Sequence, residues 1–505
     1  MPEPRRILTC SLDQRLRACL DDMAPSGVSF VQFEGDSRDL ETCRAQAECD
    51  VVLVGVPLDV DAETCMDLAT RGVWNLVTTT RARRVVVLST MRLFDSLDEG
   101  WAIDERWSPR PSTDVSLLAP YLAECGLRET AREIPVEAVV LRLDEVVDDA
   151  VWRAGDPDPT WIHVDDAANA IVAALTAEDA RRWSVHHIVR GDERSRYQRY
   201  PQRWPGLTWE PAFLDDRPRT EPLSEPSMPT APKNLTGLES PRSIAILGAA
   251  GPLAVATAMQ AEADIRLRLA DLRPLAEVAR GEPQSPGAPL PDAAVLPPHE
   301  EVALDVADYV SVRRAMEGMD TVINCTVIRP DPVQAFRVNT LGAWNVMRAA
   351  AELGIRRVVH TGPILTLAPY PVGMEADRDI HSVTDRPGAH LYFISKYLGK
   401  EIVRVYAETF GIAVPSLHFD LFTPLDPDVA LRRSSPCTIS WDDAGRAVLA
   451  AARIETMPEP FVAVTVLAPA PHDRFDPFDA QRLLDWEPWD RIDHIWHRNR
   501  AEGGS

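Results

Sequence analysis

Residues 243–254 read Ser-Ile-Ala-Ile-Leu-Gly-Ala-Ala-Gly-Pro-Leu-Ala. A short apolar run that ends in glycines predicts a buried strand that turns directly into a helix. Gly248 and Gly251 would let backbone amides approach a pyrophosphate, and the helix N-terminus adds positive potential. About twenty residues further on, a second apolar run ends at Asp271, where a carboxylate can accept hydrogen bonds from an adenosine ribose. The stretch therefore predicts dinucleotide binding; the alternative is a tight structural turn.

The same acid bears on the choice of cofactor. A carboxylate repels a 2′-phosphate, so Asp271 favours NAD over NADP. Arg273 lies two residues further on and could instead meet that phosphate, so NADP stays open.

A tyrosine and a lysine occupy one face of a predicted helix in the same half of the chain. Tyr392 and Lys396 are four residues apart, which is about one helical turn. An ammonium near a phenol favours the phenolate, so we expect Lys396 to lower the pKa of Tyr392 and make it an acid or base. The chain has only three lysines, at 233, 396 and 400, and otherwise carries arginine. A lysine here indicates a site that requires a compact ammonium.

The first half alternates apolar runs with helical stretches. We expect strands at 6–10, 28–33, 50–55, 84–89 and 138–143, and helices at 14–23, 62–78 and 117–133. Continuous apolar strands separated by helices predict a parallel sheet covered on both faces.

The second half repeats this plan after a proline-rich segment. Gly72–Leu76 parallels Gly342–Val346, and the double arginine at 83–84 parallels that at 356–357. Trp161–Ala167 likewise parallels Ile439–Ala444. These matches predict a tandem duplication of one Rossmann-like, doubly wound α/β fold. We expect domains at 1–214 and 241–505 with a linker at 215–240, and a proline-rich surface loop at 281–298.

The second half resembles the extended short-chain dehydrogenase/reductase family, the NAD-dependent epimerase/dehydratase group. The resemblance covers nearly all of residues 241–505. It rests on Gly248-x-x-Gly251-x-x-Ala254, Asp271, Leu304–Val306, Val322–Asn324, Val338-Asn339 and Tyr392-x-x-x-Lys396. Within the family, residues 267–272, 423–424 and 484–488 are most similar to uronate dehydrogenases.

The resemblance implies a role for each matching residue. Tyr392 would be the catalytic acid/base, and Lys396 would hold the nicotinamide ribose and tune Tyr392. Asn339 would brace the active-site strands beside the cofactor. The remaining cofactor contacts would come from Gly248, Gly251, Pro252, Leu253, Asp271, Leu272, Asp305, Val306, Cys325 and Thr326.

One position departs from the family pattern. The strand before the active site normally ends in Ser-Ser or Thr-Ser, but here Pro363 stands where the hydroxyl belongs, followed by Ile364 and Leu365. Proline cannot donate a hydrogen bond, so we expect Thr361 or Thr366 to replace the hydroxyl. A lost donor of this kind costs about 10²–10³ in rate.

Substrate contacts and other ionisable groups are less defined. Arg432 and Arg433 would lie on the substrate side, where one could clamp a carboxylate or phosphate, although a solvated surface pair is the alternative. His360 and His418 are expected to be buried in strands. We find no cluster of acids, histidines and cysteines with metal-ligand spacing.

The first half is expected to keep the fold and to have lost the cofactor site; the alternative is that it binds some other ligand. Its turn at 9–16 contains no glycine, and Asp13 would repel a pyrophosphate. Residues 112–124, where the tyrosine and lysine would fall, contain no lysine. Extended family members commonly dimerise through the catalytic helix, so we expect an internal pseudo-dimer in which residues 117–133 pack against 392–410. Further homo-oligomerisation stays open.

The net charge, the apolar segments and the cysteine spacing disfavour several classes of protein. A formal charge of −24 disfavours nucleic acids and anionic membranes as partners. No signal peptide or apolar membrane span is recognisable, and the eight scattered cysteines form no C-x-x-C pair, which favours free thiols and a cytoplasmic location. The sequence predicts an NAD(P)-dependent oxidoreductase or epimerase with a small-molecule substrate and chemistry only in the second half. The alternative is a non-catalytic NAD(P)-binding sensor or scaffold.

Overall fold

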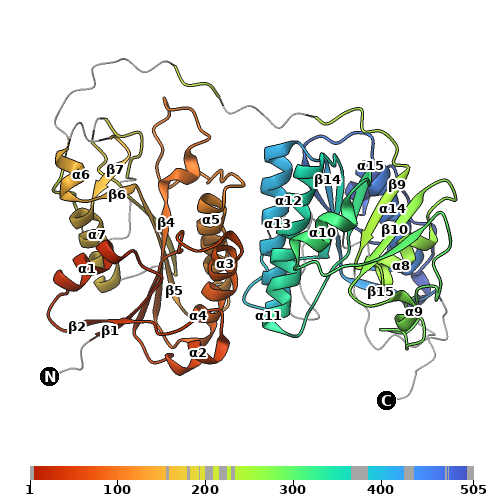
Figure 1. The fold of residues 1–505 in the computed structure, drawn as a ribbon, viewed down its shortest axis with the longest axis horizontal. Coiled ribbons are helices and arrows are strands. Elements are labelled where there is room, and N and C mark those ends of the chain that lie inside the picture. The colour runs from red at the N-terminus through yellow and green to blue at the C-terminus, as the bar shows by residue number, and fades with distance from the viewer. Residues whose placement is uncertain are drawn as a thin grey trace. The chain divides into compact units, whose positions relative to one another are not determined.

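The chain forms two compact α/β units (Figure 1). The computed structural model describes residues 5–154, 158–178, 182–192, 194–199, 209–214, 225–228, 234–365, 385–425, 437–471, 475 and 477–496. Unit 1 comprises Met1–Ala231 with Gly388–His390, and unit 2 comprises Pro232–Pro387 with Leu391–Ser505. Each unit is built on a parallel sheet, so the predicted fold class is confirmed.

The described part of unit 1 contains a six-stranded parallel sheet in the order β2-β1-β3-β4-β5-β8. Its strands are β1 (Arg5–Cys10), β2 (Val28–Gln32), β3 (Val51–Val54), β4 (Arg84–Thr90), β5 (Glu137–Leu143) and β8 (Trp183–Ile188). β3 is buried along its whole length, as expected of a strand covered on both faces. A separate parallel pair, β6 (Glu145–Val147) and β7 (Trp161–His163), was not predicted.

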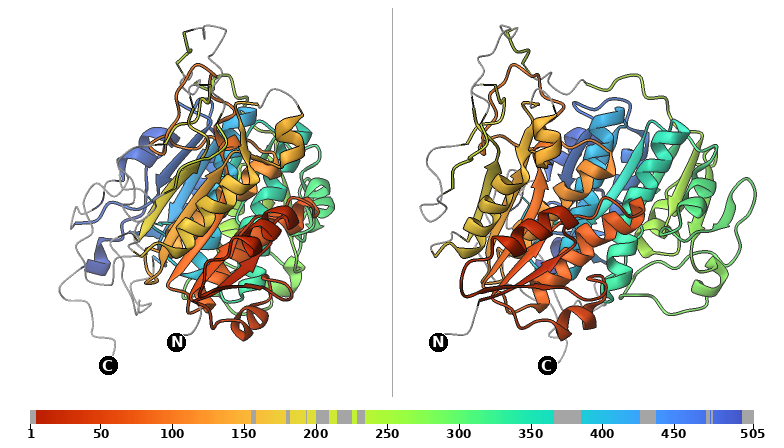
Figure 2. Two further views of the ribbon diagram at one scale, coloured as in Figure 1. Left: turned by 90° about the vertical axis from the view of Figure 1, so that its left-hand side faces the viewer. Right: turned by 60° about the vertical axis from the view of Figure 1, so that its left-hand side comes forward.

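Helices cover both faces of this sheet. α1 (Gln14–Asp22) and α7 (Val164–Thr176) pack together on one face, which Figure 2 turns toward the viewer. α3 (Ala62–Asp67), α4 (Val73–Thr79) and α5 (Val115–Thr130) cover the other face. A π-helical turn, Leu68–Gly72, divides the single helix predicted at 62–78. The short helices are α2 (Leu40–Ala45), α6 (Asp149–Arg153) and a 3-10 turn at Met91–Phe94.

Unit 2 has a seven-stranded parallel sheet within its described residues, in the order β11-β10-β9-β12-β13-β14-β17. Its strands are β9 (Ser243–Leu247), β10 (Arg266–Asp271), β11 (Glu300–Ala303), β12 (Thr321–Asn324), β13 (Val358–Pro363), β14 (Val414–Phe419) and β17 (Phe461–Thr465). β15 (Leu421–Thr423) and β16 (Thr438–Ser440) form a separate parallel pair. Without β11, the strand order of this sheet is the same as in unit 1.

The helices of unit 2 also form two layers (Figure 1). α8 (Pro252–Met259), α14 (Trp441–Arg453) and α15 (Phe478–Leu484) lie on one face, and α10 (Tyr309–Met316), α12 (Gly342–Leu353) and α13 (Leu391–Phe410) lie on the other. The remaining turns are α9 (Leu275–Val278), α11 (Pro332–Ala335), a π-helical turn at Phe336–Leu341 and a 3-10 turn at Asp493–Trp496.

Two buried polar arrangements recur in the two units. Arg84 donates to Ala174 O and Ala177 O at the end of α7, and Arg357 donates to Ala452 O at the end of α14. A cation at this place satisfies carbonyls that the helix leaves unpaired. Asp166 accepts hydrogen bonds from the amides of residues 212 and 213, and Asp443 accepts from those of residues 489 and 490. The tandem duplication stays a prediction that these features favour.

The end of the predicted linker packs on unit 2. Leu235 and Met457 exchange backbone hydrogen bonds of 2.9 and 2.8 Å. Leu238 is buried in the apolar core of the unit. Because these side chains are apolar, residues 234–240 lie against the fold instead of spanning solvent.

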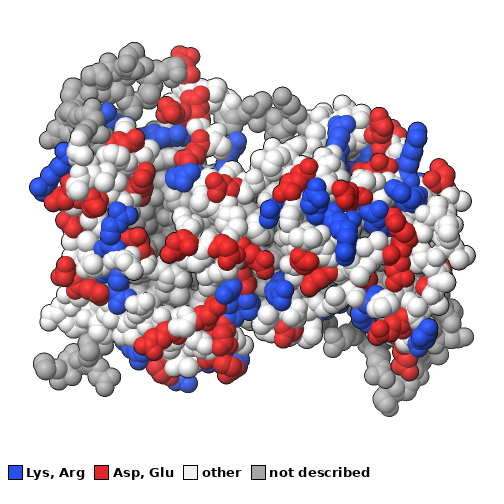
Figure 3. All heavy atoms as spheres, viewed as in Figure 1, with Lys and Arg blue, Asp and Glu red and all other residues white. Residues whose placement is uncertain are grey.

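The surface charges and the state of the cysteines can be compared with the sequence. Acidic and basic side chains are interspersed on the face shown in Figure 3. All eight cysteines are free thiols, as predicted. Among the helices of the described ranges, none has the length and apolar character needed to cross a bilayer.

Candidate functional site

The glycine turn of unit 2 is shaped by a close approach of backbone. Gly248 has φ +79°, and a Cβ there would lie 3.0 Å from Cys325 C and from Thr326 N. Gly251 caps α8 without a side chain, and Pro252 is the first helical residue. The amides of Leu253 and Ala254 lie in the first turn of α8 and have no acceptors within the helix. They therefore form an anion-binding position.

The corresponding turn in unit 1 is closed by a side chain. The Asp13 carboxylate caps α1 and accepts hydrogen bonds from Arg15 N at 2.9 Å and Leu16 N at 3.3 Å. These are the amides that would otherwise face a phosphate. An anionic cap on this helix excludes a second anion by charge as well as by hydrogen bonding.

Asp271 ends β10 beside the glycine turn. Its Oδ2 accepts a hydrogen bond from Ala250 N at 2.9 Å, and its Oδ1 accepts one from Arg273 N at 3.0 Å. A carboxylate has about four acceptor positions, so two remain for ribose hydroxyls. The neighbouring Leu272 side chain is 72% exposed.

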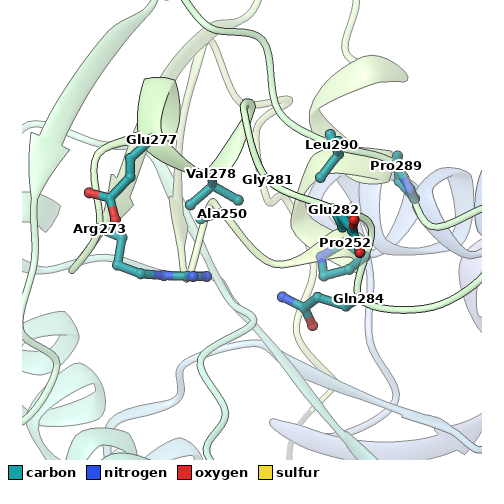
Figure 4. A pocket seen from close by; sticks show the side chains of 10 residues that line it. All are labelled: Ala250, Pro252, Arg273, Glu277, Val278, Gly281, Glu282, Gln284, Pro289 and Leu290. Atoms are coloured by element: carbon teal, nitrogen blue, oxygen red, sulfur yellow. The ribbon is translucent and has the colours of Figure 1, made fainter.

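A pocket of about 310 Å³ adjoins this turn. Figure 4 shows Arg273, Glu277 and Val278 on one side of it and Pro289 and Leu290 on the other. The proline-rich insertion predicted at 281–298 therefore supplies a wall of this pocket as well as a surface loop. The insertion lies between α9 and β11.

Asp305 and Val306 follow β11 at the same edge of the sheet. Asp305 is exposed, and its Oδ1 accepts a hydrogen bond from Ala307 N at 2.9 Å. Val306 is buried, and a Cβ on Gly342 would lie 2.9 Å from its Cγ1. The Val306 side chain thus packs inward against the start of α12.

Lys396 lies on α13, the helix that the sequence predicts to be catalytic, and links the ends of two strands. Its Nζ donates to Thr326 O at 3.1 Å and to Thr361 O at 2.9 Å. The side chain is 4% exposed, and burial lowers its pKa to about 8. Thr326 follows β12 and Thr361 lies in β13, so one ammonium holds both strand ends against α13.

The electrostatics of Tyr392 correct the expectation from the sequence. Burial raises its pKa, although Lys396 was expected to lower it. The cation that opposes this rise is Arg329, whose Cζ lies 4.9 Å from the centre of the Tyr392 ring. The expectation was wrong because the effect of burial on the phenol outweighs that of the nearby cation. Arg329 was missed; its signal was an arginine in the loop that follows β12.

Asn339 connects the Arg329 loop to the helix of Tyr392. Its amide nitrogen donates to Ile328 O at 2.7 Å and to Ser395 Oγ at 2.9 Å, and its Oδ1 accepts from Ile328 N at 3.1 Å. Ile328 precedes Arg329, and Ser395 precedes Lys396. Asn339 thus positions both the loop that carries Arg329 and the helix that carries Tyr392.

Thr361 does not supply the missing hydroxyl. Its Oγ1 donates to Asn324 O at 2.9 Å, so its single proton is already used between the strands. This hydrogen bond contradicts the predicted catalytic role. Pro363 ends β13, and Ile364 and Leu365 are 3% and 2% exposed.

Other predicted residues have structural positions or lie outside the described ranges. His360 and His418 are buried in β13 and β14, as predicted, and burial holds the pKa of each well below its usual value. Cys325 lies beside the glycine turn, and burial raises its thiol pKa to about 11. Arg432, Arg433 and Thr366 lie outside the described residues.

Unit 1 has a different network where unit 2 has its tyrosine and lysine. Aligning Tyr121-Leu122 of α5 with Tyr397-Leu398 of α13 places Pro120 where Lys396 stands. Ser89 at the end of β4 donates to Glu124 Oε1 at 2.5 Å, and Arg142 donates to both oxygens of Glu124 at 3.0 and 2.7 Å. Ser89 therefore donates its hydroxyl proton to the carboxylate of a buried ion pair.

Comparison with known proteins finds similarity in part of unit 2. Residues 254–428 match the model of the NAD dependent epimerase/dehydratase family. Uronate dehydrogenase of Pseudomonas putida is 27% identical over 176 residues, which are 34% of this chain and 61% of that protein. Cinnamoyl-CoA reductase 1 of Petunia hybrida is 38% identical over 82 residues, 16% of this chain and 23% of the relative. The chain thus spans less than two thirds of either relative.

Among solved structures, the crystal structure of uronate dehydrogenase from Agrobacterium tumefaciens has 24% identity and a TM-score of 0.41, covering 52% of this chain and 90% of that one. Residues 254–428 of unit 2 are thus similar to the NAD dependent epimerase/dehydratase family.

Proposed function

We propose that unit 2 is an NAD-dependent enzyme that oxidises or epimerises a hydroxyl-bearing small molecule. The observation that carries this proposal is the position of Tyr392, half-buried at the sheet edge beneath the Arg329 guanidinium and one turn from Lys396. A tyrosine with a cation over its ring and a buried ammonium beside it is suited to exchange a proton with a substrate hydroxyl.

The residues around the glycine turn fit a dinucleotide. Gly248 has a positive φ and lies too close to the backbone of Cys325 and Thr326 for a side chain, and Gly251 has no side chain to cap the first amides of α8. Asp271 retains acceptor positions for a ribose, and its charge favours NAD. The Arg273 guanidinium lies at the adjoining pocket and keeps NADP as the alternative. NAD, when bound, supplies a hydride acceptor.

The chain's own residues handle the proton. On oxidation, the C–H bond of the carbinol breaks with its electron pair, and the hydroxyl proton passes to the Tyr392 oxygen. The Arg329 cation stabilises the phenolate that accepts this proton, because it opposes the effect of burial. Lys396, held at Thr326 O and Thr361 O, fixes the helix that carries the tyrosine.

The proposed substrate is a sugar-like molecule, in keeping with the uronate dehydrogenases similar to this chain. An acidic group on it would find a partner in Arg329, whose side chain is exposed beside Tyr392. Arg432 and Arg433 remain proposed substrate contacts. The buried Ile364 and Leu365 offer no hydrogen bonds to such a substrate.

Cofactor reduction across a panel of uronates, neutral sugars and hydroxy acids tests this proposal. NADH formation is expected with at least one class and should fall by about 10²–10⁴ in Tyr392→Phe, with NAD affinity unchanged. Tyr397→Phe, on the same helix, is the matched control. Turnover that survives Tyr392→Phe would contradict the assigned proton transfer.

A second candidate is a non-catalytic NAD sensor. It is favoured by Pro363 and by the Thr361 hydroxyl, whose proton is donated to Asn324 O. Tight NAD binding without turnover of any substrate in the panel would select this candidate. Unit 1 is proposed to bind no cofactor and to be the internal partner of unit 2, with residues 117–133 packed against residues 392–410. Cross-linking between engineered cysteines on these two helices tests that packing.

A further inference from the structure

Two charged side chains meet the carboxyl edge of the unit 1 sheet. Asp144 directly follows β5, and Arg190 lies two residues beyond β8. These strands are paired neighbours, with Leu143 opposite Ile188, so both side chains arise at one place. In open parallel α/β sheets this edge is where ligands bind.

Arg190 is buried with its terminal nitrogens unused. Its side chain is 0% exposed, and neither Nη donates to any residue that the structure describes. Nε lies 3.1 Å from Asp192 Oδ2 without hydrogen-bond geometry, and Cζ lies 5.5 Å from the Trp152 ring. The planar fork of the guanidinium is therefore available for a bidentate anion.

Asp144 is similarly buried and unused. The residue is 5% exposed, and within the described ranges neither carboxylate oxygen has a hydrogen-bond partner. Burial raises its pKa well above the usual range, and the Arg190 charge opposes this rise. The two side chains nevertheless form no ion pair. A neutral or ionised Asp144 can hydrogen-bond to a hydroxyl.

Other buried arginines of unit 1 behave differently. Arg71 donates to Asp67, Arg84 to Glu137 and to helix carbonyls, and Arg142 to both oxygens of Glu124. Arg190 differs from these three arginines, because its ion pair with Asp192 involves only Nε and leaves both Nη atoms without a hydrogen bond to any described residue. Buried donors without acceptors are unfavourable, so native proteins retain them mainly where a ligand or a reaction requires them.

Aromatic side chains border the same edge. Phe213 stacks on His163 with ring centres 3.7 Å apart, and Trp152 lies edge-on to both rings at 5.8 Å. His163 Nδ1 accepts from Asp165 N at 3.2 Å, which assigns its proton to Nε2. Trp152 and Phe213 are half-buried and form an apolar border next to the two charges.

We propose that unit 1 binds a small hydroxycarboxylate, its carboxylate held by the Nη atoms of Arg190 and its hydroxyl by Asp144. This site lies in the unit that lacks the glycine turn and the tyrosine–lysine pair. Unit 1 would then be a ligand-binding domain beside the proposed enzyme, and its ligand would be independent of NAD.

Calorimetric titration of the full chain tests the proposal. The probes are sodium lactate, glycerate and malate, with glycerol as the uncharged control and inorganic phosphate as the anion without a carboxylate. At least one hydroxycarboxylate should bind, about 30-fold or more weakly in Arg190→Met and measurably more weakly in Asp144→Asn. Arg81→Gln, whose side chain is 77% exposed, and Tyr392→Phe should leave binding unchanged.

Thermal unfolding without ligand separates a binding role from a structural one. Arg190→Met should lower the unfolding temperature less than Arg84→Met does, because it removes one ion pair, with Asp192, and no hydrogen bonds. Arg84→Met should unfold at a lower temperature, because it leaves helix carbonyls unpaired. Absence of any Arg190-dependent binding, binding of phosphate alone, or destabilisation by Arg190→Met equal to that by Arg84→Met would overturn the proposal.

Discussion

The titration of Lys396 gives the sharpest test of the geometry around Tyr392. Burial lowers its pKa from 10.5 to about 8, even though its ammonium donates to two main-chain carbonyls. The interval corresponds to about 3 kcal/mol that the folded state loses by holding the ammonium charged. Desolvation therefore outweighs the two hydrogen bonds.

The sign of the linked stability follows from the lowered pKa. At about pH 7 the folded state carries the full cost, and the cost disappears as the pH rises through the folded and then the unfolded pKa. Between about pH 7 and about pH 9.5 the cost should fall from about 3 to about 1 kcal/mol. Relative to Lys396→Met, the wild-type chain should thus gain about 2 kcal/mol of unfolding free energy over this window.

The scarcity of lysine makes the measurement direct. With ¹³Cε-labelled lysine the chain gives three signals, and Lys396→Arg and Lys400→Arg assign two of them. We expect the Lys396 signal to titrate near 8. Arg482→Gln removes an exposed cation and is the control for the stability comparison. A Lys396 signal that titrates at the pKa of a free lysine would refute the burial described above.

Three further substitutions test the site. Arg329→Met removes the cation that opposes the raised pKa of Tyr392, so the acidic limb of the pH–rate profile for oxidation, which rises as Tyr392 loses its proton, should move to higher pH, and kcat at neutral pH should fall. Gly248→Ala introduces a Cβ at positive φ, 3.0 Å from Cys325 C, and should cost about 1–2 kcal/mol or more, measured by denaturant unfolding, with weaker NAD binding. Asp271→Asn should weaken NAD about 10-fold or more and reduce discrimination against NADP, measured by calorimetry.

Each of these variants has an outcome that contradicts its reasoning. An unchanged pH–rate profile in Arg329→Met would mean that this guanidinium does not act on the tyrosine. Gly354→Ala also places a side chain at positive φ, but in open space, and serves as the control for Gly248→Ala. Equal NAD affinity in Asp271→Asn and wild type would remove the carboxylate from the cofactor site.

Much of the fold could be predicted from the local spacing of apolar residues. The strands and helices predicted in the first half lie where expected, because alternation of apolar runs with helical periodicity is a property of neighbouring residues. The predicted strand–turn–helix at 243–254 and the acid ending the next strand are present for the same reason. The parallel pairs β6–β7 and β15–β16 were missed because three-residue strands leave no periodicity to detect.

The candidate site divides in the same way. By itself the sequence identified the glycine turn, Asp271 and the spacing of Tyr392 and Lys396, because each is a pattern within one element. Only the tertiary structure decided which cation acts on Tyr392, because Arg329 arrives from the loop after a different strand. It also decided that Thr361 donates to Asn324, and that Asp144 and Arg190 share an edge without forming an ion pair with each other. Strand pairing and burial, which join residues distant in the chain, set these contacts and the direction of each pKa change.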